Sequence, residues 1–161
     1  MTPERRQQLV GRRERLKEQR QREWLEPHRR DFLALLTKAG INYSIADDAP
    51  LVDWISSRFK VDQWSSIDWR DVKKWRRIAS EVSASPQLLV GLAGEERYGD
   101  PEIAIVYADA ARPSLKMRYS ELARHLDVIV DFAWQTWVFD PSSDWIIEFH
   151  HDLGWRWGKA A

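Results

Sequence analysis

The C-terminal segment 134–159, WQTWVFDPSSDWIIEFHHDLGWRWGK, constrains the fold more than any other part of the chain. Asp140-Pro141 places proline at the favoured second position of a β-turn, and the stretch from Asp152 to Gly154 is a second turn signal. Apolar and aromatic runs of strand length lie before, between and after these turns. The segment therefore predicts three antiparallel strands, near 136–140, 145–151 and 155–157.

Successive side chains of a strand point to opposite faces, so the alternation sorts this sheet into two faces. One face is wholly apolar and is expected to lie on the core: Val138, Trp145, Ile147, Phe149, Trp155 and Trp157. The other face mixes aromatic and charged side chains: Trp137, Phe139, Ile146, Glu148, His150 and Arg156. A helix could cover the aromatic end of this second face, or the face could be a recognition surface with aromatic anchors and a charged rim.

Helix signals divide the first half of the chain. Thr2 and Pro3 start a helix whose apolar stripe is too narrow for a core, so we expect it to protrude and to end at Pro27. A second helix then runs to Gly40. A short strand at 41–45 and a helical turn or two at 51–59 follow. Near Asp68 we expect a helix with an inner face formed by Val72, Trp75, Ala79 and Val82.

After Ser85-Pro86 the pattern resembles sheet. The short apolar runs 88–92 and 103–107 predict a hairpin across the turn-rich stretch 94–101. Ser120 caps a further helix, whose inner face is Leu122, Leu126, Ile129 and Ala133. The whole order predicts an α+β fold with helices packed on an antiparallel sheet. We expect a basic N-terminal helix, 1–26, and a single α+β domain, 27–161.

The zero net charge of the chain, 25 Lys and Arg against 25 Asp and Glu, conceals a division. Residues 1–30 hold ten basic and five acidic side chains, so the remainder carries a net charge of −5. Residues 127–152 contain six carboxylates and neither Lys nor Arg. Such asymmetry bears on the choice of partner and on association rate rather than on fold.

Several classes of protein are excluded by what the sequence lacks. Without cysteine, the chain has no disulfides and no zinc-thiolate site, which suits the cytoplasm. No apolar run reaches the roughly 18–20 residues of a membrane span. Nucleophile, P-loop, dinucleotide and zinc-protease motifs are missing, so we expect neither an enzyme nor a bound cofactor.

Two clusters invite a more specific function. Glu148, His150 and Asp152 alternate along one strand, which would suit a metal or an acid–base pair, but such side chains more often form a solvated edge. The basic cluster KKWRR at 73–77, with the basic N-terminal helix, suggests nucleic acid. Because acidic residues are interleaved with each basic run, solvated helix faces are the preferred interpretation. We therefore expect no metal and do not favour a nucleic-acid partner.

The runs WVF and DWIIEFHHDLGWRWG give the last third of the chain a resemblance to immunity proteins of bacterial polymorphic-toxin and contact-dependent inhibition systems. This class-level resemblance implies a cytoplasmic protein that binds and neutralises a cognate toxin. Nuclease toxins are basic, so an acidic, Trp-rich surface would favour the encounter. The expected partner-binding residues are Trp137, Phe139, Asp140, Asp144, Glu148, His150, Asp152 and Arg156. The alternative is a nucleic-acid-associated or assembly-scaffold protein that acts through the basic N-terminal helix.

Overall fold

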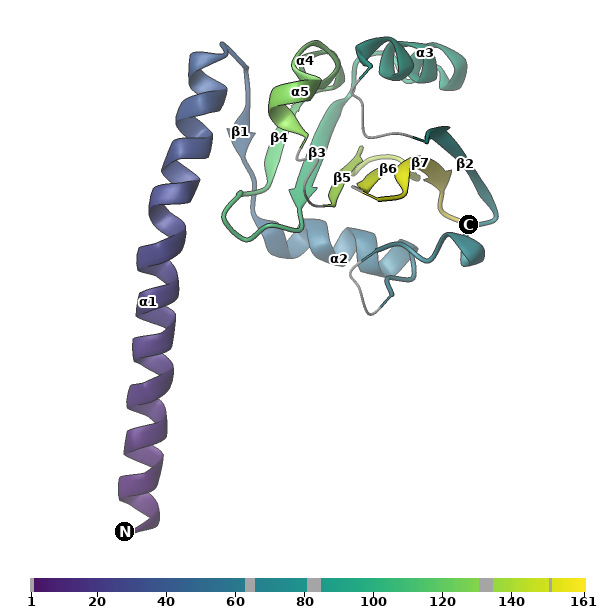
Figure 1. Ribbon diagram of the computed structural model, residues 1–161. Helices are drawn as coiled ribbons and strands as arrows, with labels where there is room; N and C mark the ends of the chain where they lie inside the picture. Colours follow the sequence, from purple (N-terminus) through teal and green to yellow (C-terminus); the bar gives the residue numbers. More distant parts are fainter. Residues whose placement is uncertain (1, 63–65, 81–84, 131–134, 151) are drawn as a thin grey trace.

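A computed structural model describes residues 2–62, 66–80, 85–130, 135–150 and 152–161. In this part of the chain, seven antiparallel strands form one sheet in the order β1-β4-β3-β5-β6-β7-β2 (Figure 1). The strands are β1 (Ser44–Ile45), β2 (Lys74–Ala79), β3 (Glu102–Tyr107), β4 (Leu115–Arg118), β5 (Thr136–Phe139), β6 (Trp145–His150) and β7 (Gly154–Lys159). The three strands expected at the C-terminus are confirmed, as are β3 and the α+β class.

Helices lie on both faces of the sheet, which gives three layers (Figure 1). One face carries α2 (Asp48–Arg58), and the other carries α3 (Pro86–Glu96), α4 (Tyr119–Arg124) and α5 (Leu126–Ile129). A short 3₁₀ helix, Trp69–Asp71, leads into β2. Both edge strands, β1 and β2, come from the first half of the chain, so the C-terminal hairpins occupy the middle of the sheet.

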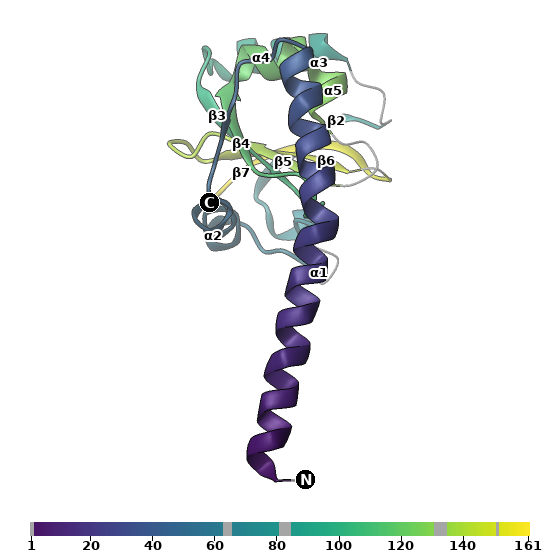
Figure 2. The ribbon, with the colours of Figure 1, turned by 90° about the vertical axis from the view of Figure 1, so that its left-hand side faces the viewer.

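Helix α1 (Pro3–Lys38) is continuous, and the expected break at Pro27 is wrong. Proline removes one backbone hydrogen bond, but the hydrogen-bonded turns before and after Pro27 keep the helix continuous. Only the last turns of α1 join the domain, where Phe32 and Leu36 are buried. The rest protrudes as a rod, visible from two directions in Figures 1 and 2. The protruding helix expected from its narrow apolar stripe is confirmed.

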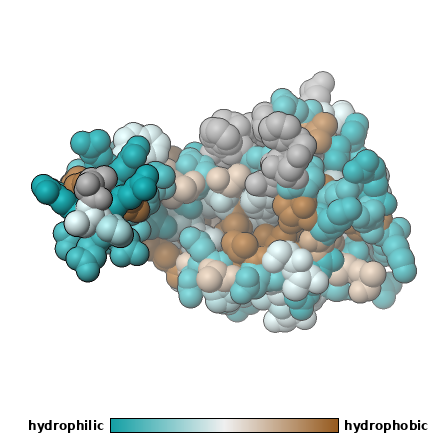
Figure 3. All heavy atoms as spheres, turned by 90° about the horizontal axis from the view of Figure 1, so that it is seen from below, coloured by the Kyte–Doolittle hydropathy of each residue, from teal (hydrophilic) through white to brown (hydrophobic). Residues whose placement is uncertain are grey.

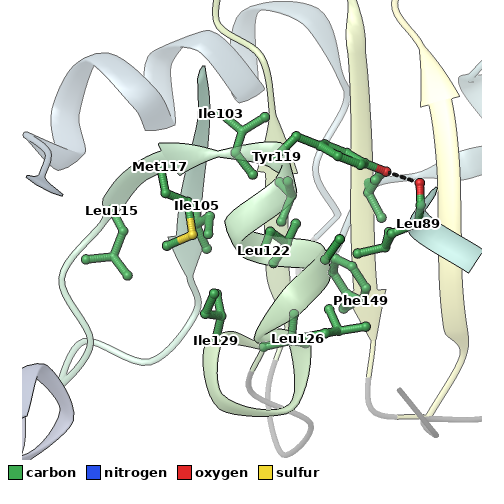
Figure 4. Packing of buried hydrophobic residues seen from close by; sticks show 14 of the residues in the cluster. Leu89, Ile103, Ile105, Leu115, Met117, Tyr119, Leu122, Leu126, Ile129 and Phe149 are labelled. Atoms are coloured by element: carbon green, nitrogen blue, oxygen red, sulfur yellow. Dashed lines mark hydrogen bonds between the residues drawn. The ribbon is translucent and has the colours of Figure 1, made fainter. Parts of the chain in front are cut away.

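The first core lies between the sheet and helices α3, α4 and α5 (Figure 4). Tyr119 in α4 donates its hydroxyl proton to the carbonyl of Leu89 in α3 at 2.8 Å, which ties two covering helices together. The apolar face predicted from alternation is confirmed, because all of its members lie in this core: Val138, Trp145, Ile147, Phe149, Trp155 and Trp157.

Two elements differ from their predictions: one predicted helix is a strand, and one predicted strand is a helix. Residues 74–79 form strand β2 rather than a helix, because they pair along their length with β7, where Trp75 faces Gly158. Residues 88–92 belong to helix α3 rather than to a hairpin strand. Ser85-Pro86 is a helix start signal that outweighs the short apolar run, whose periodicity suits either state. Val82 and Ala133, both predicted as core, lie outside the described residues.

Candidate protein-binding surface

Of the two alternatives for the second face of the C-terminal sheet, the structure has the covered one, because helix α2 packs on its aromatic end. The choice of Trp137 and Phe139 as exposed partner-binding residues is therefore wrong. Trp137 is 7% exposed and Phe139 is fully buried in a second core on the α2 side of the sheet. The ring of Trp54 from α2 stacks on Phe139, with 4.2 Å between centroids and 13° between planes. These aromatic side chains therefore stabilise the fold and are not available to contact a partner.

Glu148 is also buried, with no exposed surface, and cannot form the rim of an interface. Within the described chain its carboxylate accepts four hydrogen bonds. The donors are Ser66 Oγ at 3.1 Å, the Ile67 backbone N–H at 2.8 Å, Trp69 Nε1 at 2.8 Å and Trp137 Nε1 at 2.9 Å. Because a buried charge needs such compensation, Glu148 fastens the segment 66–69 over the sheet. Its role is structural.

Arg156 lies at the edge of the same face, between Glu148 of β6 and Arg77 of β2 in the strand register. Burial lowers the pKa of the Arg156 guanidinium, and the charge of Glu148 opposes that shift. The guanidinium lies 5.9 Å from the ring centroid of Trp75, which is 43% exposed. Arg156 therefore belongs to the β2 edge and not to an acidic surface.

His150 is the last residue of β6, and Asp152 lies in the turn that follows it. His150 Nδ1 accepts hydrogen bonds from the backbone N–H of Asp152 at 3.1 Å and of Leu153 at 3.2 Å. The imidazole thus stabilises the turn, while Glu148 points into the core. Among the described residues, no group of three or more His, Asp or Glu side chains is arranged to hold a metal ion.

Asp140 and Asp144, in the turn between β5 and β6, remain at the surface. Asp140 shapes the turn by accepting hydrogen bonds from its own loop, and Trp54 Nε1 of α2 donates to the Pro141 carbonyl at 3.2 Å. Helix α2 and this turn therefore form one surface, which we call the acidic α2 side. It carries five carboxylates at least partly accessible to solvent: Asp47, Asp48, Asp53, Asp140 and Asp144.

An apolar hollow of about 280 Å³ lies beside α2. Its exposed large apolar members are Val52, at 48%, and Val61, at 39%. Figure 3 looks onto this side of the molecule, where hydrophobic atoms reach the surface near the middle of the face. The hollow is lined by Val52, Ile55, Ser56, Val61, Val106, Tyr107, Ala108 and Trp137. The hollow could not be predicted from the sequence, because its lining comes from separate segments; of the predicted site residues, Trp137 lines it.

The basic cluster 73–77 lies on β2, at the free edge of the sheet, and not on a helix. Arg76 forms an ion pair with Glu95 of α3 at 2.6 Å. Lys74 lies over the ring of Trp157, 5.3 Å from its centroid. Both cations are therefore engaged within the domain, and the charge of Arg76 is compensated by a carboxylate.

Comparisons of the chain with protein-family models, curated proteins and solved structures found no match. None of the described helices is long and apolar enough to cross a membrane. The described surface therefore has three distinctive features: the acidic α2 side, the apolar hollow beside it and the protruding helix α1.

Proposed function

We propose that the chain is a cytoplasmic protein-binding module that neutralises a basic protein, such as a nuclease toxin, in the manner of an immunity protein. The contact is made by the acidic α2 side and the hollow beside it. The chain acts by occupying its partner and has no reaction of its own. This keeps the type of surface expected from the sequence but moves it from the buried face of β5 and β6 to helix α2.

The hollow next to the carboxylates is the observation that carries this proposal. Val52 and Val61 are exposed apolar side chains at the mouth of a cavity that can receive an apolar anchor from a partner. Burying one such side chain contributes about 1.5–3 kcal/mol. A small apolar centre with a charged surround is the usual construction of a protein interface.

The carboxylates supply the preference for a basic partner. Asp53 follows Val52 directly on α2, and Asp140 and Asp144 lie on the turn that Trp54 contacts. Arg58, the cation of α2, has its guanidinium 4.6 Å from the ring centroid of Trp54. An acidic surface of this kind accelerates encounter with a basic protein at low salt and repels nucleic acid.

The proposal is tested with the chain immobilised and exposed to an extract of its native host. We expect a basic protein to be retained, and we expect its nuclease activity to be suppressed while it is bound. The variant Val52→Arg/Asp53→Lys should weaken the binding by about a hundredfold, equivalent to losing roughly 2.7 kcal/mol. Both positions are exposed, so the variant should fold normally.

A matched control places the same substitutions on the opposite side of the sheet. Val90 and Asp127 are also exposed, and Val90→Arg/Asp127→Lys gives the same change of charge. This variant should bind as the wild-type chain does. Equal weakening by both variants would show that net charge matters and the α2 side does not, and retention of no protein would refute the module itself.

A further inference from the structure

The first part of α1, residues 3–24, makes an unusual surface, which we call the arm. Apart from Gly11, which is half-buried, every residue of the arm is exposed. The arm is about 33 Å long at 1.5 Å per residue. Most helical stability in proteins comes from packing of an apolar stripe, and no described residue of the arm is buried against the domain. The arm therefore has the properties of a helix that packs against a partner.

A heptad pattern runs along the arm. Arg6, Arg13 and Arg20 repeat every seven residues, and Leu9 and Leu16 repeat every seven residues between them. The alternating spacings of three and four residues place all five on one side of a helix. We call this stripe the Arg/Leu seam. Both leucines are about half exposed, Leu9 at 52% and Leu16 at 47%.

The seam faces away from the side by which α1 joins the domain. Leu36 is buried in the first core and lies twenty residues after Leu16. At about 100° per residue, these two side chains are about 200° apart around the helix axis. The domain of the same chain therefore does not lie on the side to which the seam points, and another molecule must supply the surface that covers it.

Charge is also divided between the two sides of the arm. Three further cations, Arg5, Arg12 and Lys17, and one carboxylate, Glu23, border the seam. Glu4, Glu14 and Glu18 lie on the other side together with Arg15 and Arg22, so the seam side is the more basic one. Within the described part of the chain, none of the three seam arginines takes part in a salt bridge. The seam thus offers unpaired guanidinium groups on both sides of each leucine.

We propose that the Arg/Leu seam docks against an acidic amphipathic helix of a partner protein. Leucines of the partner would pack on Leu9 and Leu16, and its carboxylates would pair with the seam arginines. A second copy of the arm in parallel would place arginine against arginine, which is repulsive. A membrane surface needs a broad apolar face, and here the cations lie on the same side as the few leucines.

The probe is a synthetic three-heptad peptide with Leu at the positions that face the leucines and Glu at those that face the arginines. Its binding to the full-length protein is measured by titration calorimetry. The seam variant Arg13→Glu/Arg20→Glu should weaken binding by at least about tenfold. The control Arg15→Glu/Arg22→Glu, with the same charge change on the side turned away from the seam, should have little effect.

Two further measurements complete the test. Sedimentation of the free protein should show a monomer. If the wild-type chain is a dimer and the seam variant is a monomer, the seam serves self-association instead. If duplex DNA binds more tightly than the peptide, and both variants weaken DNA binding equally, the arm binds nucleic acid instead. Failure of the peptide to bind, or equal weakening of peptide binding by both variants, would also overturn the proposal.

Discussion

At the scale of single residues, Glu148 shows where sequence reasoning ends. Alternation correctly placed Glu148 and Trp137 on one face of the sheet. It could not show that this face is covered, since Trp69 and its neighbours approach from a segment without a regular hydrophobic period. Glu148 and Trp137, which suggested a recognition surface, belong instead to a buried hydrogen-bond network. The sequence could not reveal this, because the residues that cover Glu148 are distant from it in the chain.

The network predicts a large cost for an isosteric change. In Glu148→Gln, the amide group keeps one acceptor oxygen and presents N–H groups to donors that previously met an oxygen. We expect the free energy of unfolding to fall by about 2–4 kcal/mol, because buried donors lose their acceptors. Urea denaturation measures this loss. As a control, Glu102→Gln at an exposed position should change the free energy of unfolding by less than about 0.5 kcal/mol. An equally small change for Glu148→Gln would contradict the role of the network.

Asp68, in the same covering segment, predicts a pH dependence. Arg70 donates two side-chain hydrogen bonds to Asp68, at 2.8 and 2.9 Å, and holds the pKa of that carboxyl below its ordinary value of 3.8. Because the folded-state pKa is lower than the unfolded-state pKa, the pairing stabilises the fold above about pH 4 and is lost as the pH falls through the lowered pKa.

The variant Asp68→Asn should therefore lower Tm at neutral pH, and the difference from the wild-type chain should shrink as the solution is acidified below about pH 4. Thermal unfolding followed by circular dichroism at a series of pH values measures both. Asp53→Asn, at an exposed position on α2, is the control. A Tm difference that stays constant into acid would show that the Asp68 charge does not contribute.

At the scale of elements, the well-predicted segments are those whose local signals and tertiary surroundings agree. Strands β5, β6 and β7 have turn residues at both connections and a continuous apolar face. Strand β2 shows the opposite case. Its residues have a helix-like spacing, but the edge of β7 offers them hydrogen-bond partners, and Gly158 there leaves room for Trp69. Strand β4, only four residues long, was missed.

Helix α1 makes a prediction about independence of elements. Deleting residues 2–24 removes none of the buried residues of α1, so the shortened chain should unfold cooperatively, with a midpoint close to that of the full chain. Phe32→Ala should instead cost about 3–5 kcal/mol, because the phenylalanine packs in the first core. Calorimetry distinguishes the two. Loss of a cooperative transition on deletion of 2–24 would show that the arm stabilises the domain.

At the scale of the whole molecule, the zero net charge is distributed over two separate surfaces. The arm presents a basic seam, and helix α2 with the turn at 140–144 presents carboxylates beside an apolar hollow. In Figure 1, α2 lies below the sheet. Helix α1 lies to the left of β1, at the edge of the sheet opposite β2, and its arm extends downwards past the domain. The division of charge can be read from the sequence, but only the fold places helix α2 beside the turn at 140–144.

The most direct test of the protein-binding function is hydrogen exchange of the whole chain with and without the basic protein retained from its host. Binding through the acidic α2 side predicts slower exchange of backbone amides in 48–58 and 140–144, and unchanged exchange in the arm and in α3. The protected segments should regain their free exchange rates when the bound protein is released at high salt, because charge attraction is screened. Protection confined to the arm, or to the edge of β2, would contradict the account.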